Sequence, residues 1–217
     1  REFWDGRPVP PFLSSLTETV GKHPAIEVRT ETQVTEIKGY KGRFDVAMQC
    51  GNTGTPRHET CGAIILATGA REWAPDGLYG YGQDNRIVTQ LELNGLFETA
   101  PESIKKLRRV VMIQCVGSRT EERPYCSRVC CTQAIQNALR LKEQAPDAQV
   151  IVAYRDVRTY GLREDLYLRT RDRGIIFVRY DPENAPDVRV PEDTGITQLP
   201  VVRLRDPILE RTFEIPA

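Results

Sequence analysis

Apolar residues recur at helical spacing over residues 10–22, and this spacing predicts an amphipathic helix that ends near Gly21. Its apolar face would consist of Phe12, Leu13, Leu16 and Val20. Alternation of apolar and polar residues then predicts three strands, over residues 26–30, 33–37 and 44–48. A fourth apolar run, residues 61–70, predicts a strand that ends in small residues.

Strand-like and helix-like segments alternate in the second part of the chain. The pattern predicts the order β-α-β-α-β, over residues 110–114, 126–143, 150–154, 163–173 and 175–180. Because parallel strands need long crossover connections, this order predicts a parallel sheet with right-handed crossovers. Polar residues 181–197 predict an exposed loop, and a hairpin follows from Val201.

The change of pattern near Pro101 predicts two domains, residues 1–100 and residues 101–217. The fold class is α/β, with additional antiparallel segments. The sequence starts with Arg1 and ends in a strand-like segment, so we expect it to be part of a longer protein.

Composition and charge exclude several classes of protein. With 217 residues, of which 40% are hydrophobic, the chain can bury a sizeable core. Thirty basic and thirty acidic residues balance, so no general attraction to nucleic acid or to an anionic membrane is expected. No apolar run approaches a membrane span and no signal peptide is visible, which predicts a cytoplasmic protein.

Four of the six cysteines lie in one stretch with the spacing C-x10-C-x3-C-C. Cys115 follows the predicted strand at residues 110–114, and the other three stand at the start of the predicted helix: Cys126, Cys130 and Cys131. Four thiolates gathered in this way can bind zinc or an iron–sulfur cluster. The N-terminus of the helix would stabilise the negative charge of such a group.

The directions of the cysteines on a helix favour an iron–sulfur cluster over zinc. Cys130 and Cys131 would point about 100° apart, so their sulfurs converge poorly on one small ion. The separated irons of a cubane suit divergent thiolates better. Zinc, a redox disulfide and plain burial of small apolar residues stay open as alternatives.

The remaining candidates carry weaker signals. Tyr125, Arg123 and Arg128 crowd the cysteines and could hydrogen-bond their sulfurs, or be ordinary loop residues. Six other residues are expected to have no special role: His23 and His58 at the surface, Cys50 and Cys61 as buried free thiols, and Trp4 and Trp73 in packing.

The run at residues 61–70 ends in Ala67, Thr68 and Gly69, the signature of flavoproteins with two dinucleotide-binding domains. A strand end without bulky side chains lets backbone amides approach a dinucleotide closely. Taken alone this signal is weak, because glycine often merely ends a strand.

Several runs resemble the middle of the A subunit of heterodisulfide reductase and its relatives, among them MIQCVGSR, RPYCSRVCCTQAI, YRDVRTYG and GIIFVRYD. The likeness extends from about His23 to the end of the chain. These relatives are cytoplasmic iron–sulfur flavoproteins on a thioredoxin-reductase-like scaffold. The resemblance therefore implies a fragment of a flavoprotein with two dinucleotide-binding, Rossmann-like domains.

The resemblance also implies site residues and cofactors. A 4Fe-4S cluster near the flavin would be bound by Cys115, Cys126, Cys130 and Cys131. Val34 would offer its backbone to the adenine side of FAD, and the pyrophosphate side would be lined by Ala67, Thr68 and Gly69.

Electron transfer between FAD and iron–sulfur clusters is the function that the resemblance implies. The expected partners are other iron–sulfur subunits of a heterodisulfide-reductase-like complex, ferredoxin, or hydrogenase or dehydrogenase subunits. One alternative is an NAD(P)H-dependent disulfide oxidoreductase of thioredoxin-reductase type, but its C-x2-C pair and glycine loop are missing. The other is a zinc-stabilised module that only binds partners.

Overall fold

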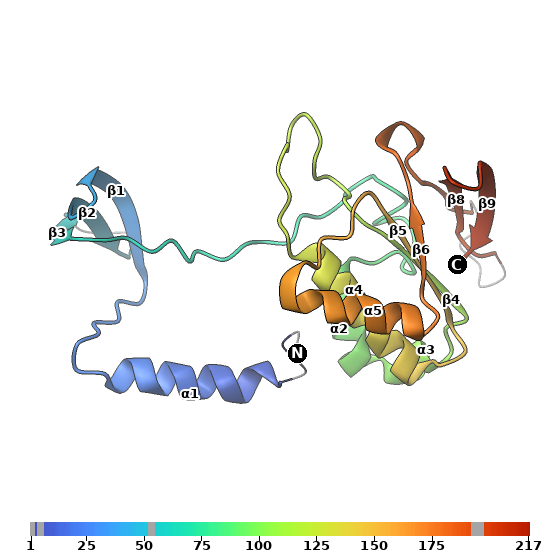
Figure 1. Cartoon of the computed structure of the whole chain (residues 1–217). Coiled ribbons are helices and arrows are strands. Elements are labelled where there is room, and N and C mark those ends of the chain that lie inside the picture. The colour runs from blue at the N-terminus through green and yellow to red at the C-terminus, as the bar shows by residue number, and fades with distance from the viewer. Residues whose placement is uncertain (1–2, 4–6, 52–54, 192–197) are drawn as a thin grey trace. The chain divides into compact units, whose positions relative to one another are not determined.

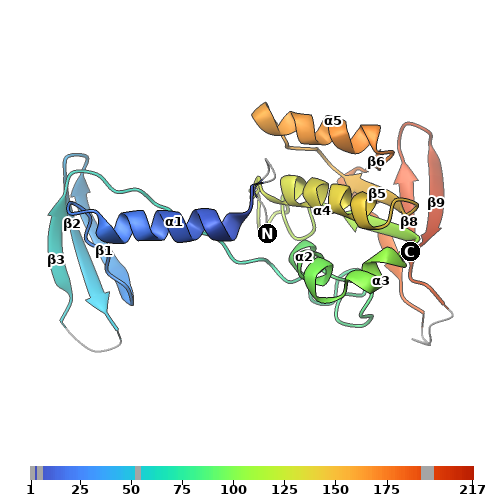
Figure 2. The same cartoon turned by 90° about the horizontal axis from the view of Figure 1, so that it is seen from below.

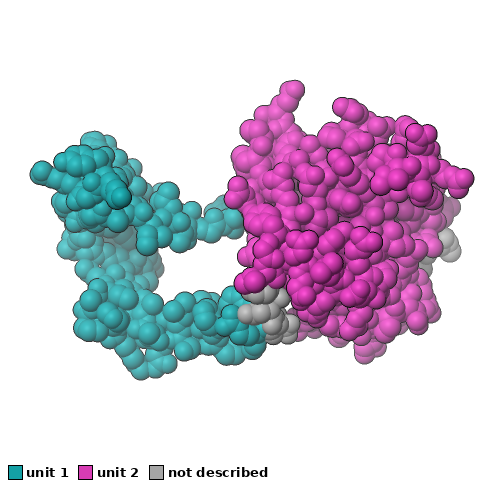
Figure 3. Space-filling view, viewed as in Figure 1, with its two compact units in different colours: residues 1–3, 7–71 teal, residues 4–6, 72–217 magenta. Residues whose placement is uncertain are grey.

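The computed structural model of the protein describes residues 3, 7–51, 55–191 and 198–217. The chain divides into two compact units (Figure 3). The first consists of residues 1–3 and 7–71, and the second of residues 4–6 and 72–217. The predicted cofactor-binding domains, residues 1–100 and 101–217, stay a prediction.

The first unit contains one helix and one antiparallel sheet (Figure 1). Its elements are α1 (Val9–Lys22), β1 (Thr32–Tyr40), β2 (Arg43–Cys50) and β3 (Arg57–Cys61), and the sheet order is β1-β2-β3. Prolines in the first turn of α1 suit its start, because that turn lacks intrahelical partners for its N–H groups. The predicted helix and the strands at residues 33–37 and 44–48 are confirmed.

Two predicted strands of the first unit are wrong. Residues 26–30 form no strand, and the apolar run at residues 61–70 leaves the sheet after Cys61, which pairs with Phe44. Ile65 and Leu66 are 91% and 80% exposed. A strand persists only where its backbone groups find partners, and no strand of the described residues pairs with residues 63–70.

A parallel three-stranded sheet forms the centre of the second unit, as the alternating pattern predicted. Its order is β4-β5-β6, with bounds β4 (Arg109–Ile113), β5 (Gln149–Tyr154) and β6 (Ile176–Arg179). Helices α4 (Cys130–Gln144) and α5 (Glu164–Asp172) form the crossovers, and the 3-10 turn η1 (Gly161–Arg163) precedes α5. Gly174, at a φ of +73°, follows the end of α5 as expected.

Two short helices precede the sheet, α2 (Gln90–Thr99) and α3 (Pro101–Lys105). Thr89 caps α2 through a reciprocal pair of hydrogen bonds with Glu92. Helix α4 packs between α5 and the α2–α3 pair (Figure 2). These helices therefore cover one face of the parallel sheet.

Antiparallel strands cover the other face. They have the order β7-β8-β9, with bounds β7 (Asp187–Arg189), β8 (Val201–Asp206) and β9 (Arg211–Pro216). The predicted hairpin from Val201 is confirmed. The predicted loop at residues 181–197 is partly wrong, because it contains β7 and the 3-10 turn η2 (Pro182–Asn184), while residues 192–197 lie outside the described part.

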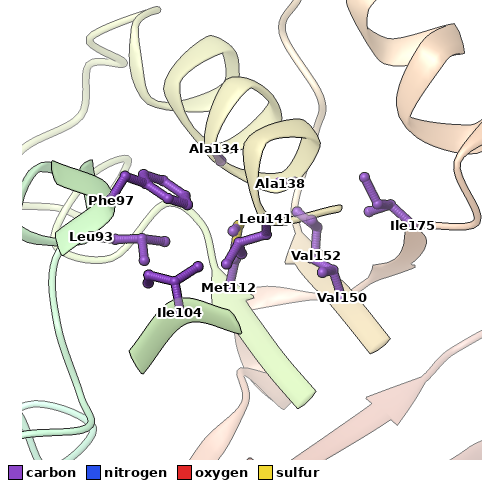
Figure 4. Close-up of a cluster of buried hydrophobic side chains, with 10 residues drawn as sticks. All are labelled: Leu93, Phe97, Ile104, Met112, Ala134, Ala138, Leu141, Val150, Val152 and Ile175. Carbon is purple, nitrogen blue, oxygen red and sulfur yellow. The ribbon is translucent and has the colours of Figure 1, made fainter. Parts of the chain in front are cut away.

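The two covered faces explain why β5 is buried along nearly its whole length. Val150 and Val152 point toward the helices, whereas Ile151 and Ala153 point toward the antiparallel strands. Figure 4 shows the helical side of this core, which consists of Leu93, Phe97, Ile104, Met112, Ala134, Ala138, Leu141, Val150, Val152 and Ile175. The alanines of α4 let this helix approach the strands closely, which fixes where its N-terminus lies.

The observed architecture is mixed α/β with parallel and antiparallel strands, as predicted. The finer expectation of two dinucleotide-binding domains is a proposal taken up below. Within the described residues, none of the helices has the length and apolar character needed to span a membrane.

Candidate functional site

Three of the four predicted metal ligands, Cys115, Cys130 and Cys131, lie at the carboxyl edge of the parallel sheet. Cys115 comes two residues after β4, and Cys130 and Cys131 begin α4. The loop between β4 and α4 is the long yellow-green excursion in Figure 1. Asp156 follows β5 by two residues and reaches the same edge. In open α/β sheets this edge is the usual place for a bound group.

Unusual backbone conformations concentrate in this loop. Cys115, Arg119 and Arg128 have φ angles of +64°, +59° and +61°. Left-handed conformations are uncommon for residues with a Cβ and cost about 1–3 kcal/mol each. Such strain persists only where surrounding contacts impose it, and it is typical of functional sites.

The start of the cysteine helix differs from the prediction. We expected the helix to begin at Cys126, but the left-handed turn at Arg128 delays it to Cys130. Cys126 therefore lies before the helix, and its Sγ accepts a hydrogen bond from the Arg128 N–H at 3.4 Å. Cys126 and Cys130 therefore do not lie on one helix.

Cys130 and Cys131 form a coupled pair of thiols. The Cys131 thiol donates a hydrogen bond to the Cys130 sulfur, which together with Ser127 lowers the pKa of Cys130 to about 6 despite burial. The pKa of Cys131 is raised, first by this hydrogen bond and then by burial. Cys131 Sγ also lies 3.6 Å from the carbonyl oxygen of Asp156. The Cys130 thiol therefore ionises more readily than the Cys131 thiol.

Cys115 belongs to the same electrostatic neighbourhood. Burial raises its pKa, and the negative charge of Cys130 raises it further. The Arg155 backbone N–H and the Arg119 guanidinium oppose this rise in the pKa of Cys115 by hydrogen bonding to its sulfur. The structure thus brings Cys115, Cys130 and Cys131 within mutual reach.

The described side chains do not converge on a site for a single metal ion. In the described part of the chain, no three His, Cys, Asp or Glu side chains are close enough to hold one metal ion. A cluster carries its own sulfides and spaces its irons apart, so its ligands need not converge on a point.

Unpaired buried polar atoms point to the same place. Four side-chain atoms of this kind occur among the described residues, and two belong to residues next to a cysteine in the sequence, Gln114 Nε2 and Thr132 Oγ1. Buried polar atoms normally have partners, so unpaired ones indicate room for another group.

Of the predicted neighbours of the sulfurs, none contacts them through its side chain in the expected way. Arg128 acts through its backbone N–H. Arg123 stacks over Trp73 at 4.6 Å, and its Nη1 donates to the carbonyl of Gly117 at 3.3 Å. Tyr125 is exposed, and its carbonyl accepts from the Arg119 N–H at 3.3 Å. Packing of Trp73 is confirmed, and Trp4 lies outside the described residues.

Sequence reasoning missed Arg119 and Asp156. The Arg119 Nη1 lies 2.6 Å from Asp156 Oδ2, across two segments that are distant in the sequence. The place of Asp156 shortly after the predicted strand at residues 150–154 could have indicated a role, because polar residues directly after a parallel strand reach the edge of the sheet where ligands bind. For Arg119 only its place between two of the cysteines could have suggested a role.

The predicted FAD contacts lie in the first unit. Val34 is half exposed in β1, beside an irregularity in its pairing with β2. Ala67, Thr68 and Gly69 lie outside the three-stranded sheet that contains Val34, and Gly69 has a φ of +69°. All three residues are exposed.

The residues expected to have no special role give a mixed outcome. His23 and His58 are exposed, as predicted, and His58 Nδ1 lies 3.2 Å from Asp45 Oδ2. Cys50 and Cys61 are free thiols. Cys50 is exposed and Cys61 is half-buried, so the prediction that both are buried is wrong.

Free cysteines grouped at the ligand edge of a parallel α/β sheet are typical of metal-binding or redox proteins. No model of a known protein family matches the chain. The chain is 37% identical over 171 residues to the A subunit of "H(2)/formate:CoB-CoM heterodisulfide,ferredoxin reductase" from Methanococcus maripaludis. The matched region covers 72% of this chain and 25% of that protein. It is also 36% identical over 171 residues to the iron–sulfur A subunit of "CoB--CoM heterodisulfide reductase" from Methanocaldococcus jannaschii, with coverages of 72% and 25%.

A more distant relative is the A subunit of "Ferredoxin:CoB-CoM heterodisulfide reductase" from Methanosarcina acetivorans, 30% identical over 196 residues, with coverages of 72% and 24%. The chain is therefore a homologue of the A subunit of heterodisulfide reductase, and the predicted resemblance is confirmed. It spans about a quarter of the length of these curated relatives.

Proposed function

We propose that this chain carries the cluster-binding part of an iron–sulfur flavoprotein subunit that transfers electrons in a heterodisulfide-reductase-like complex. The grouping of Cys115, Cys130 and Cys131 at the carboxyl edge of the parallel sheet carries this proposal. The names of the relatives support it, since they are reductase subunits and one is called an iron–sulfur subunit.

The proposed ligands of a 4Fe-4S cluster are Cys115, Cys126, Cys130 and Cys131. Such a cluster supplies one-electron transfer when bound. The chain would contribute the free N–H groups and the positive dipole end of α4, which stabilise negative charge. It would also contribute hydrogen bonds from backbone N–H groups to the sulfurs, including that of Arg128 to Cys126.

FAD is the second proposed cofactor: residues 1–100 would form part of an FAD-binding domain, and residues 101–217 an NAD(P)-domain-like α/β domain that carries the cluster site. Val34 would contact its adenine side, and Ala67, Thr68 and Gly69 its pyrophosphate side. Support comes from the confirmed resemblance and from the small side chains at the last three positions, which permit close approach of a dinucleotide.

The second domain would not bind NAD(P)H. A dinucleotide pyrophosphate would need the loop after β4 to be open, with glycines that allow close approach. In this loop the Trp73 ring packs so tightly on Gly117 that a Cβ could not be accommodated there. This contact favours an electron-relay protein over an NAD(P)H-dependent disulfide oxidoreductase.

The proposed partners are other iron–sulfur subunits, ferredoxin, or hydrogenase or dehydrogenase subunits, and the proposed compartment is the cytoplasm. Ferredoxin, H2 and formate stand in the names of relatives. The formal net charge of zero offers no general attraction to nucleic acid.

Metal analysis tests the proposal directly. Protein purified without oxygen should contain iron and acid-labile sulfide, and reduction should produce the paramagnetic signal of a reduced cluster. The C130A variant should lose that signal, whereas C50A, at an exposed cysteine in the first unit, should keep it. Stoichiometric zinc without sulfide would instead support the zinc-stabilised module.

A further inference from the structure

Arg119 is held in place from several sides within the loop between Cys115 and Cys126. Its Nη1 lies 2.6 Å from Asp156 Oδ2, and its side chain is only 22% exposed. Its carbonyl accepts a hydrogen bond from Arg155 Nη1 at 3.0 Å. The left-handed backbone at Arg119 completes this arrangement. The guanidinium therefore occupies one fixed, partly buried position.

The Arg119 guanidinium faces sulfur. It lies close enough to Cys115 to hydrogen-bond its sulfur. Its Nη1 is buried and is paired with the Asp156 carboxylate at 2.6 Å.

Asp156 contacts both Arg119 and a second proposed ligand, Cys131. The Asp156 carbonyl lies 3.6 Å from Cys131 Sγ, while its carboxylate holds Arg119. Arg158 Nη2 is farther from the same carboxylate, at 3.7 Å. The Arg119–Asp156 pair thus connects Cys115, after β4, with Cys131, at the start of α4.

We propose that Arg119 is a positioning residue that raises the reduction potential of the cluster bound by these cysteines. This inference rests on the proposed function. The guanidinium stabilises the state with one more negative charge, and the paired Asp156 carboxylate offsets part of this effect. N–H groups that donate to the cysteine sulfurs act in the same direction. Uptake of one electron forms and breaks no bond, and Arg119 stays protonated throughout.

The test is an anaerobic redox titration of the protein with mediator dyes, followed by paramagnetic resonance. R119M removes the positive charge and the hydrogen bonds of the guanidinium. R119K keeps the positive charge but lacks the planar guanidinium with its several N–H donors. In R119M the equilibrium constant for reduction should fall about tenfold, which is about 59 mV for one electron. R119K should lie between R119M and the unaltered protein. R203M, at an exposed arginine of β8, should leave the potential unchanged.

Iron and sulfide content is measured first for every variant. If R119M and R119K both hold a full cluster at the unaltered potential, the inference is wrong. If R119M does not fold or does not bind iron, the R119K variant tests the inference. A lowered reduction potential of the cluster in R119K supports the role of Arg119, and an unaltered potential contradicts it. Absence of iron and sulfide from the unaltered protein would contradict the proposed function instead, so the two failures are distinguishable.

Discussion

The indole ring of Trp73 packs directly against the backbone of Gly117. A Cβ at position 117 would overlap three ring atoms, Cζ3, Cη2 and Cε3. Arg123 lies over the same ring, with its guanidinium 4.6 Å from the ring centroid and a hydrogen bond to the Gly117 carbonyl. The loop that follows Cys115 is therefore closed onto a tryptophan from the start of the second unit.

This contact predicts that G117A destabilises the protein and lowers its iron content. Gly117 has a φ of +63°, so alanine would suffer both backbone strain and the overlap with Trp73. G82A is a matched control, because Gly82 has a φ of +80° and open space around its Cβ position. The strain alone should cost about 1–2 kcal/mol. Denaturant unfolding should show a clearly larger loss for G117A, and equal losses would contradict the prediction.

Removing the ring should remove the overlap. In a W73A background, the additional cost of G117A should fall to that of G82A, since only the backbone strain remains. A double-mutant cycle measures this coupling from four unfolding curves. Additive effects of W73A and G117A would show that the ring does not limit the space at position 117.

The core beneath the cysteine site should be sensitive to lost volume. Leu141 is fully buried on the inner face of α4. L141A should lower the free energy of unfolding by about 2–5 kcal/mol, because it leaves a cavity between the helix and β4 and β5. L209A removes the same atoms from an exposed turn and should cost much less. Comparable losses in the two variants would mean that α4 is loosely packed.

Acid should weaken the start of α2. The Thr89 N–H donates to the Glu92 carboxylate and lowers its pKa below the ordinary 4.5, and Tyr81 adds a further hydrogen bond. Because the folded pKa is the lower one, this stabilisation is complete above pH 4.5 and is lost as the pH falls through the folded value. The stability of E92Q should therefore depend less on pH below 4.5 than that of the unaltered protein. Unfolding curves at several acidic pH values measure the difference, and parallel pH profiles would contradict it.

The sequence by itself determined the parallel sheet, its crossover helices and the C-terminal hairpin. These elements follow from local apolar periodicity, and each finds its partners within the chain. It also determined the family resemblance and the type of ligand, since four thiols at that spacing restrict the chemistry whatever their exact directions. The element boundaries depended on more than periodicity, as the delayed start of α4 after Arg128 shows.

Tertiary structure decided the rest. The apolar run at residues 61–70 has the composition of a strand, but a strand requires backbone partners, and composition does not supply them. The Trp73–Gly117 contact and the Arg119–Asp156 pair join segments that are far apart in the sequence. The Arg119–Asp156 pair forms because the carboxyl ends of β4 and β5 meet at one edge, where side chains from separate loops come within reach of one another.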